Sequence, residues 1–173
     1  MHWEAVEQFI QKGQAILPVN KPGVGDVTRL VDLSGRERDL AMQASTFLKH
    51  VLAFFGADLV TLRRRFGPLI GKKKMVPLPL SSTRILIPFN TREAIGRQTR
   101  TGWVVACRVM GVEERSEVRT AIQLINYTVE VHHSHAFCMQ QLRYARLVQL
   151  EFDALHKGLA ESQVSESSSP YSE

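Results

Sequence analysis

Residues 63–103 constrain the fold more than any other stretch, because this part of the chain combines a strong positive charge with short apolar runs. The apolar runs cover residues 75–80, 85–87 and 103–110, and they are rich in residues that favour β-strands. Basic residues stand between the runs. Such a pattern predicts a folded, charged surface supported by strands rather than a disordered basic tail.

Ten basic residues lie within residues 63–100, against one acidic residue, Glu93. They are Arg63, Arg64, Arg65, Lys72, Lys73, Lys74, Arg84, Arg92, Arg97 and Arg100. This segment has a net charge of +9 and the rest of the chain −4, which together give the +5 of the whole sequence. One basic face on an acidic scaffold is typical of proteins that bind a polyanion, so we predict that all ten residues contact a nucleic acid. A solvated face without a partner is the alternative interpretation.

The N-terminal third predicts strands followed by a pair of helices. Residues 9–10 and 15–19 are expected to form a hairpin, residues 21–26 a turn, and residues 27–33 another strand. Residues 36–44 fit either a strand or a helical turn.

The helical pair occupies the centre of the chain. The first helix is expected from Ser45, its N-cap, to Phe55, with Gly56 as its stop. The second is expected from Asp58 to Gly67-Pro68. It would turn Leu59, Leu62 and Phe66 inward and project Arg63, Arg64 and Arg65 outward.

Further strands are expected after these helices. Residues 75–80 suit an edge strand because Pro77 and Pro79 interrupt them. Residues 85–87 predict a strand that ends at Pro88, and residues 103–110 predict its partner. The connection between them, residues 90–100, is long for a hairpin, and long ordered loops tend to be functional.

The C-terminal part predicts a hairpin and a long helix. Residues 112–117 are expected to form a solvated acidic turn. Residues 121–125 and 128–132 are expected to pair around Asn126-Tyr127. A helix is expected from Ser134 to Gly158, with one apolar face that comprises Phe137, Tyr144, Val148, Phe152 and Leu155. Residues 162–173 are rich in Ser and Glu, which predicts disorder.

Together these patterns predict an α+β fold: a mostly antiparallel sheet with a central helical pair and a long C-terminal helix. We expect residues 1–160 to form a single domain and residues 161–173 an acidic, Ser-rich tail. No apolar run is long enough to span a bilayer, and the N-terminus has no secretory pattern. With only Cys107 and Cys138, no disulfide framework is expected. We therefore predict a reduced, cytoplasmic protein that binds neither membrane nor cofactor.

Other kinds of site fit the sequence poorly. The segment Gly71-Lys72-Lys73-Lys74 differs from a phosphate-binding P-loop, because a lysine replaces the hydroxyl residue that would bind the metal. The cluster His132-His133-x-His135-x-x-Cys138 contains metal-ligand types but matches no zinc spacing. Near the basic segment Glu93 stands alone, whereas a metal-dependent nuclease needs clustered carboxylates. We therefore predict neither a metal site nor an enzyme.

Aromatic residues are expected mainly in the core. Trp103 opens an apolar run, so burial is a better interpretation than stacking on a nucleic-acid base. The same interpretation applies to Phe54, Phe55 and Trp3.

Several short motifs resemble the competence transcription factor (ComK) family of Gram-positive bacteria. In the central part these motifs are Phe54-Phe55-Gly56, the basic run Lys72 to Lys74, the proline-broken residues 75–89 and Gly102-Trp103-Val104. In the C-terminal part they are Ile125-Asn126, Val129-Glu130-Val131, Ser134, Phe137 and the helix with Gln141, Arg143, Tyr144 and Ala145. The resemblance covers residues 9–152 and is weak before Ser45.

This resemblance implies a DNA-binding activator of DNA-uptake genes. Members of the family bind AT-rich promoter boxes, chiefly through the minor groove, as dimers that pair on the site. Family members also have a basic, aromatic C-terminal extension that an adaptor of the protease machinery recognises. An acidic, Ser-rich stretch stands there in this chain, so recognition by such an adaptor is a doubtful expectation.

We therefore expect a DNA-binding transcription regulator, with residues 90–100 as the element that reads DNA. An RNA-binding or ribosome-associated protein is the first alternative, and a small phosphate-handling enzyme is the second. A homodimer or higher oligomer is expected because the C-terminal helix has a second set of apolar residues: Met139, Leu142, Leu147 and Leu150. Burial of this second set within the same chain is the competing interpretation.

Overall fold

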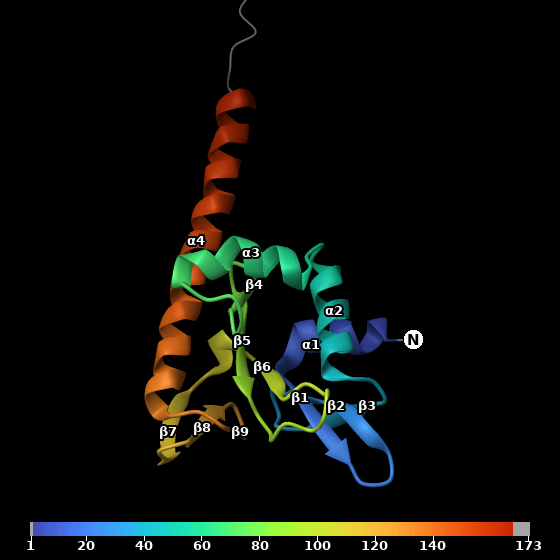
Figure 1. Ribbon diagram of the computed structural model, residues 1–173. Coiled ribbons are helices and arrows are strands. Elements are labelled where there is room, and N and C mark those ends of the chain that lie inside the picture. Colours follow the sequence, from blue (N-terminus) through green and yellow to red (C-terminus); the bar gives the residue numbers. More distant parts are fainter. Residues whose placement is uncertain (1, 168–173) are drawn as a thin grey trace, which may run out of the picture.

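The computed structural model describes residues 2–167, with side chains as far as residue 158, and has an α+β fold (Figure 1). The helices are α1 (Trp3–Lys12), α2 (Ala44–Phe54), α3 (Leu59–Ile70) and α4 (His135–Ser167), together with the 3₁₀ turn η1 (Ala106–Arg108). The strands are β1 (Gly13–Lys21), β2 (Gly25–Asp32), β3 (Glu37–Leu40), β4 (Leu78–Ser81), β5 (Arg84–Asn90), β6 (Thr101–Val105), β7 (Gly111–Ser116), β8 (Arg119–Leu124) and β9 (Tyr127–Val131). The predicted fold class is confirmed.

The strands form two antiparallel sheets. The larger sheet has six strands in the order β3-β2-β1-β6-β5-β4, and the smaller has three in the order β7-β8-β9. The first strand of the chain, β1, therefore lies in the middle of the larger sheet. It pairs with β2 along most of its length and with β6 through Ala15 and Ile16.

Both faces of the larger sheet are covered, because its strands alternate buried side chains between two hydrophobic clusters. In β5, Leu86 packs with α1, α2 and α3 in one cluster, whereas Ile85 and Ile87 pack with the smaller sheet in the other. Helix α4 contributes Val148 to the first cluster and Ala145 to the second. The basic segment therefore lies on a scaffold that is packed on both sides.

Helix α1 contradicts the predicted hairpin of residues 9–10 with residues 15–19. Phe9 is helical, and it is buried together with Ala5 and Val6 on one face of α1. Separations of three and four residues, as between Phe9 and these two, are those of one helix face. The hairpin that forms is β1–β2, which uses the predicted turn at residues 21–26 and the predicted strand at residues 27–33.

Strand β5 continues through Pro88, which was predicted to end it. Pro88 lies opposite Trp103 of β6. On the other side of β5, the pairing with β4 extends only to Leu86, so the missing N–H of Pro88 breaks no ladder there. The prediction of an edge strand is confirmed, because β4 is the last strand of its sheet. The run at residues 103–110 is a strand only as far as Val105.

Residues 112–116 belong to strand β7, and of the predicted turn at residues 112–117 only Glu117 lies in a turn. Most of β7 is exposed, and it pairs with the apolar strand β8. An edge strand tolerates charges because they discourage pairing with other chains. The predicted hairpin of the next two strands is confirmed, with Asn126 at a φ of 57° in its turn.

The central helices begin and end differently from expectation. Helix α2 has Gln43 at its N-cap instead of Ser45. Helix α3 starts where predicted, with Asp58 as its N-cap: the Asp58 side chain accepts a hydrogen bond from the Thr61 N–H at 2.8 Å. It continues through Pro68 and ends at Gly71, which has a φ of 68°.

The predicted burial of the aromatic residues is confirmed only in part. Trp103 is buried in the core at 4% exposure. Phe54 and Trp3 contradict the expectation, with exposures of 48% and 47%. Phe55 is partly buried against the core.

Helix α4 is 33 residues long and does not end at Gly158. Its first half packs against the body and its second half projects away from it (Figure 1). The predicted acidic tail thus begins within helical residues, and residues 168–173 lie outside the described part. No single helix among the described residues is long and apolar enough to cross a membrane, and only α2 with α3, bent by 85°, has such a length and composition as a pair.

Candidate nucleic-acid interface

The segment between α3 and β4, residues 71–77, is called here the turn after α3. A buried glutamine, Gln141 of α4, holds it in place. Its side-chain amide Nε2 donates hydrogen bonds to the carbonyl oxygens of Met75 and Pro88, each at 3.1 Å. Its Oε1 accepts one from the Lys72 ammonium at 3.0 Å. These bonds connect the turn, β5 and α4. Lys73, the residue after the bonded Lys72, is exposed to solvent.

Lys72 serves the scaffold, in contrast to its predicted role at the surface. Its Nζ lies 4.7 Å from the ring centroid of Phe137 and 5.0 Å from that of Tyr144, within the range of cation–π contacts. Burial lowers the pKa of Lys72. Its ammonium is directed toward α4, whereas Lys73 and Lys74 are exposed to solvent.

The three arginines of α3 have three different environments. Arg64 is exposed as predicted. Arg65 forms an ion pair with Glu151 of α4 at 3.0 Å. Arg63 is half-buried instead of projecting outward, and its Nε has no hydrogen-bond partner among the described residues. Burial lowers the pKa of Arg63.

Arg84 and Arg92 also bind within the protein. The guanidinium of Arg84 donates to the carbonyl oxygen of Ile10 in α1, with Nε at 2.8 Å. Arg92 makes a two-pronged ion pair with Asp26 in the β1–β2 hairpin, at 2.6 and 2.8 Å. Its Nε also donates to the carbonyl oxygen of Thr99 at 2.9 Å. This arginine therefore fastens residues 91–100 to the larger sheet.

The loop between β5 and β6 is ordered by its own backbone. The Thr91 N–H donates to the Arg100 carbonyl oxygen at 2.9 Å, and the Gln98 N–H donates to that of Ile95 at the same distance. Arg97 lies near the tip of the loop, within the turn that the Gln98–Ile95 bond closes. Arg100 lies at the base of the loop, where it pairs with Thr91. Both arginines are exposed, and neither has an ion-pair partner among the described side chains.

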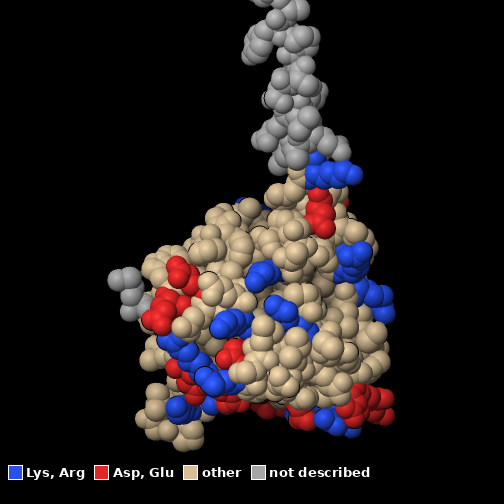
Figure 2. Space-filling view, turned by 180° about the vertical axis from the view of Figure 1, so that it is seen from behind, with Lys and Arg blue, Asp and Glu red and all other residues tan. Residues whose placement is uncertain are grey.

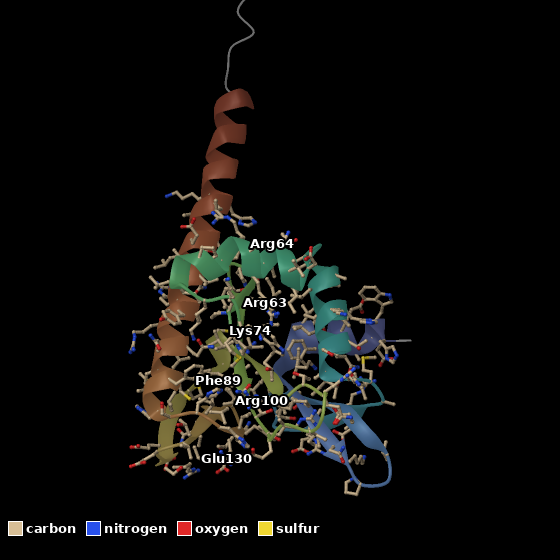
Figure 3. The ribbon with its side chains drawn as sticks, viewed as in Figure 1. Arg63, Arg64, Lys74, Phe89, Arg100 and Glu130 are labelled. Carbon is tan, nitrogen blue, oxygen red and sulfur yellow. The ribbon has the colours of Figure 1, made fainter. Side chains whose placement is uncertain are left out.

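Strand β5 connects the base of this loop to the turn after α3, because Gln141 bonds the carbonyl oxygens of Met75 and Pro88 and β5 ends at Asn90. Burial is the main cause that lowers the pKa of His133 to about 4, and the charges of His132, Arg100 and Lys72 lower it further. Arg100 and Lys72 thus act on the same ring. In Figure 3, Arg64, Arg63, Lys74 and Arg100 follow one another from α3 toward the loop. We call Arg63, Arg64, Lys73, Lys74 and Arg100 the basic surface.

The separation of charge along the sequence is not a separation into two faces. Seen from behind, the molecule also shows Lys and Arg side chains, spread over the middle of that side (Figure 2). Asp and Glu gather mainly along its lower margin (Figure 2). Exposed cations without an ion-pair partner among the described side chains also lie elsewhere, so the basic surface is distinguished by their grouping: Arg63, Arg64 and Lys73 line one hollow.

Metal ligands are not brought together in the described part of the chain. No group of three or more His, Cys, Asp or Glu side chains there is arranged to hold a metal ion. Instead, His132 lies 3.4 Å from Glu93, which also pairs with Arg119 at 3.1 Å. His133 accepts a hydrogen bond at Nε2 from the Asn90 N–H at 2.8 Å.

Two positioning residues were missed by the sequence analysis. Gln141 interrupts the apolar face of the C-terminal helix, and a polar residue at such a position is a signal that it binds something buried. Asp26 gave no such signal, because acidic residues are common in turns. Comparison of the chain with protein-family models, curated proteins and solved structures gives no significant match.

Proposed function

We propose that this protein is a DNA-binding transcription regulator that binds AT-rich duplex DNA through the basic surface and the loop at residues 91–100. One observation carries the proposal: Arg64, Lys73, Lys74, Arg97 and Arg100 are exposed cations without an acidic partner among the described side chains. Unpaired cations on a rigid support are suited to phosphate groups, because each contact releases counterions from the DNA.

The two parts of the interface have different tasks in this proposal. Lys73 and Lys74 act as point charges against the phosphate backbone. Arg97 and Arg100 stand on a loop that backbone hydrogen bonds hold together, and they would enter the minor groove, where arginine is attracted to the negative potential of AT-rich tracts. The resemblance to the ComK family adds the expected role: activation of DNA-uptake genes, by a dimer, at the nucleoid in the cytoplasm.

Salt-dependent binding tests the phosphate contacts. Lys73→Ala with Lys74→Ala should weaken binding to every duplex and reduce the slope of log K against log salt by about two. Lys12→Ala with Lys49→Ala is the matched control, because these two lysines are exposed elsewhere and removing them changes the net charge equally. Fluorescence anisotropy of labelled duplexes measures the affinity and the salt slope of each double variant. Equal losses in the two double variants would refute a localised interface.

A second comparison tests sequence preference. Arg97→Ala should cost about 1–3 kcal/mol on an AT-rich site and much less on random duplex. Equal losses on the two duplexes would make the loop a phosphate clamp only. Tighter binding to RNA of the same sequence would favour the RNA-binding alternative, and turnover of nucleotide or nucleic acid would favour the enzyme.

A further inference from the structure

A hollow with basic walls lies beside the C-terminal end of α3. Its volume is about 470 Å³, and it is lined by Arg63, Arg64, Pro68, Gly71, Lys72 and Lys73. Four of these six residues are basic and none is acidic. Such a volume falls in the range of pockets that bind small molecules.

The cations around the hollow lack the counter-charge that buried cations normally have. Burial alone lowers the pKa of Arg63, and the same is true of Lys72. The Nε of Arg63 is buried without a hydrogen-bond partner among the described residues. Arg65, one residue beyond the hollow, does have a carboxylate partner in Glu151. A desolvated cation without a partner destabilises the protein, and a bound anion would reverse this effect.

The walls of the hollow are held rigidly. At Gly67 an added Cβ would lie 2.3 Å from the carbonyl oxygen of Lys72, so the turn packs directly on the helix backbone. The Lys72 N–H donates to the Gly67 carbonyl oxygen at 3.0 Å. The Gly71 N–H donates to the Pro68 carbonyl oxygen at 3.3 Å. These bonds use helix-end carbonyl groups that would otherwise repel an anion.

We propose that this hollow binds phosphoryl groups, with Arg63, Arg64 and Lys73 as the residues that contact the phosphate oxygens. Guanidinium groups suit this ligand because they offer two parallel N–H donors to two oxygens. The phosphoryl groups belong either to a free phosphorylated molecule or to the DNA backbone. Only the second source rests on the function proposed above.

Titration calorimetry with inorganic pyrophosphate at low salt tests the site directly. The wild-type protein should bind pyrophosphate, and Arg63→Met should weaken the affinity by at least about tenfold. Because Arg63 is half-buried, the exposed pair Arg64→Met with Lys73→Met repeats the test without disturbing the core. Arg143→Met is the control, since Arg143 is an exposed arginine of α4 outside the hollow. Unchanged affinity in the first two variants, or equal loss in the control, would overturn the proposal.

Competition identifies the source of the phosphoryl groups. If saturating random duplex displaces pyrophosphate, the hollow receives the DNA backbone. If pyrophosphate remains bound to the protein–DNA complex, the hollow receives a free phosphorylated molecule. Pyrophosphate binding by a protein that binds no duplex would refute the proposed function and leave this site intact.

Discussion

Identical side chains in the basic segment have opposite roles, and their neighbours decide which. Arg92 and Arg97 are five residues apart in one loop. The side chain of Arg92 is 12% exposed and that of its partner Asp26 is 4% exposed, so this pair belongs to the interior. Arg97 is exposed and has no such partner among the described side chains. Charge in a sequence therefore indicates a basic surface without saying which cations form it.

Replacing Arg92 and replacing Arg97 should change the unfolding free energy by different amounts. Arg92→Ala leaves Asp26 buried without its partner, which should cost about 3–5 kcal/mol of unfolding free energy. Arg97→Ala should change it by no more than about 0.5 kcal/mol. Urea denaturation measures both. Replacing the pair together, with Arg92→Met and Asp26→Leu, should recover part of the loss, and a further loss would contradict this account of the pair.

His133 should make stability depend on pH. Its ring stacks on Phe137, with centroids 4.0 Å apart, and its neutral Nε2 accepts from the Asn90 N–H. Burial first, then the charges of His132, Arg100 and Lys72, lower its pKa from 6.5 to about 4. Between these two values the unfolded chain binds more protons than the folded one, so folding stability decreases as pH falls through this window.

The comparison variant is His133→Gln, which keeps a hydrogen-bond acceptor for Asn90 but does not titrate. Unfolding free energies at pH 7, 6 and 5 should decline less steeply in this variant than in the wild-type protein. His135→Gln is the control, because no contact of His135 with Asn90 is present in the structure. Parallel pH profiles for the wild-type protein and His133→Gln would show that protonation of this ring does not oppose folding.

At the scale of elements, local signals predicted those pieces whose ends are determined locally. Asp58 caps α3 through its own side chain, and Asn126 adopts the positive φ of the hairpin turn. Elements whose extent depends on pairing with another strand were mistaken. Pro88 remains in β5 because β4 pairs with β5 only as far as Leu86, and exposed β7 is a strand because β8 pairs with it. Both partners are neighbours along the chain, but the residues of one strand do not show how far its pairing extends.

Helix α4 exposes part of its second apolar set among the described side chains, and self-association through these residues stays a prediction. Of the second apolar set, Leu142 packs into the protein's own core, whereas Leu147 and Leu150 are 46% and 49% exposed. Leu147→Asp with Leu150→Asp should therefore give a folded monomer of nearly unchanged stability. Sedimentation velocity of the wild-type protein and this variant measures the change.

Leu142→Asp provides the contrast, because it should unfold the protein rather than dissociate it. A wild-type protein that is monomeric at every concentration would contradict self-association through α4. Unfolding of the Leu147 and Leu150 double variant would instead place these side chains against the same chain.

At the scale of the whole molecule, a buried glutamine joins the two sheets. The side-chain amide Nε2 of Gln14 in β1 donates to the carbonyl oxygens of Asp32 and Ile125, at 2.8 and 2.6 Å. Its Oε1 accepts from the Ile125 N–H at 2.9 Å. Gln14 lies in β1 of the larger sheet and Ile125 lies in the β8–β9 turn of the smaller sheet, so this side chain links the two sheets. Nothing near Gln14 in the sequence predicts its partner.

Gln14→Leu should lower the unfolding free energy by about 2 kcal/mol or more, because Ile125 loses the partner of its backbone groups. Gln123→Leu is the control, since its hydrogen bond to Glu113 is exposed and lies within one sheet. Thermal unfolding followed by circular dichroism compares the two. Equal shifts in Tm would show that the interior position of Gln14 is unimportant.

The central position of β1 also has a consequence for how the protein is made. During synthesis β1 leaves the ribosome before its neighbour β6, which follows more than eighty residues later, and Ile125 lies 111 residues from Gln14. Until then one edge of β1 has no partner within its own chain. Contacts between such distant residues slow folding, and an open strand edge invites pairing with other nascent chains. Yield during synthesis should therefore depend more on chaperones that shield this N-terminal hairpin than on the stability of the finished protein.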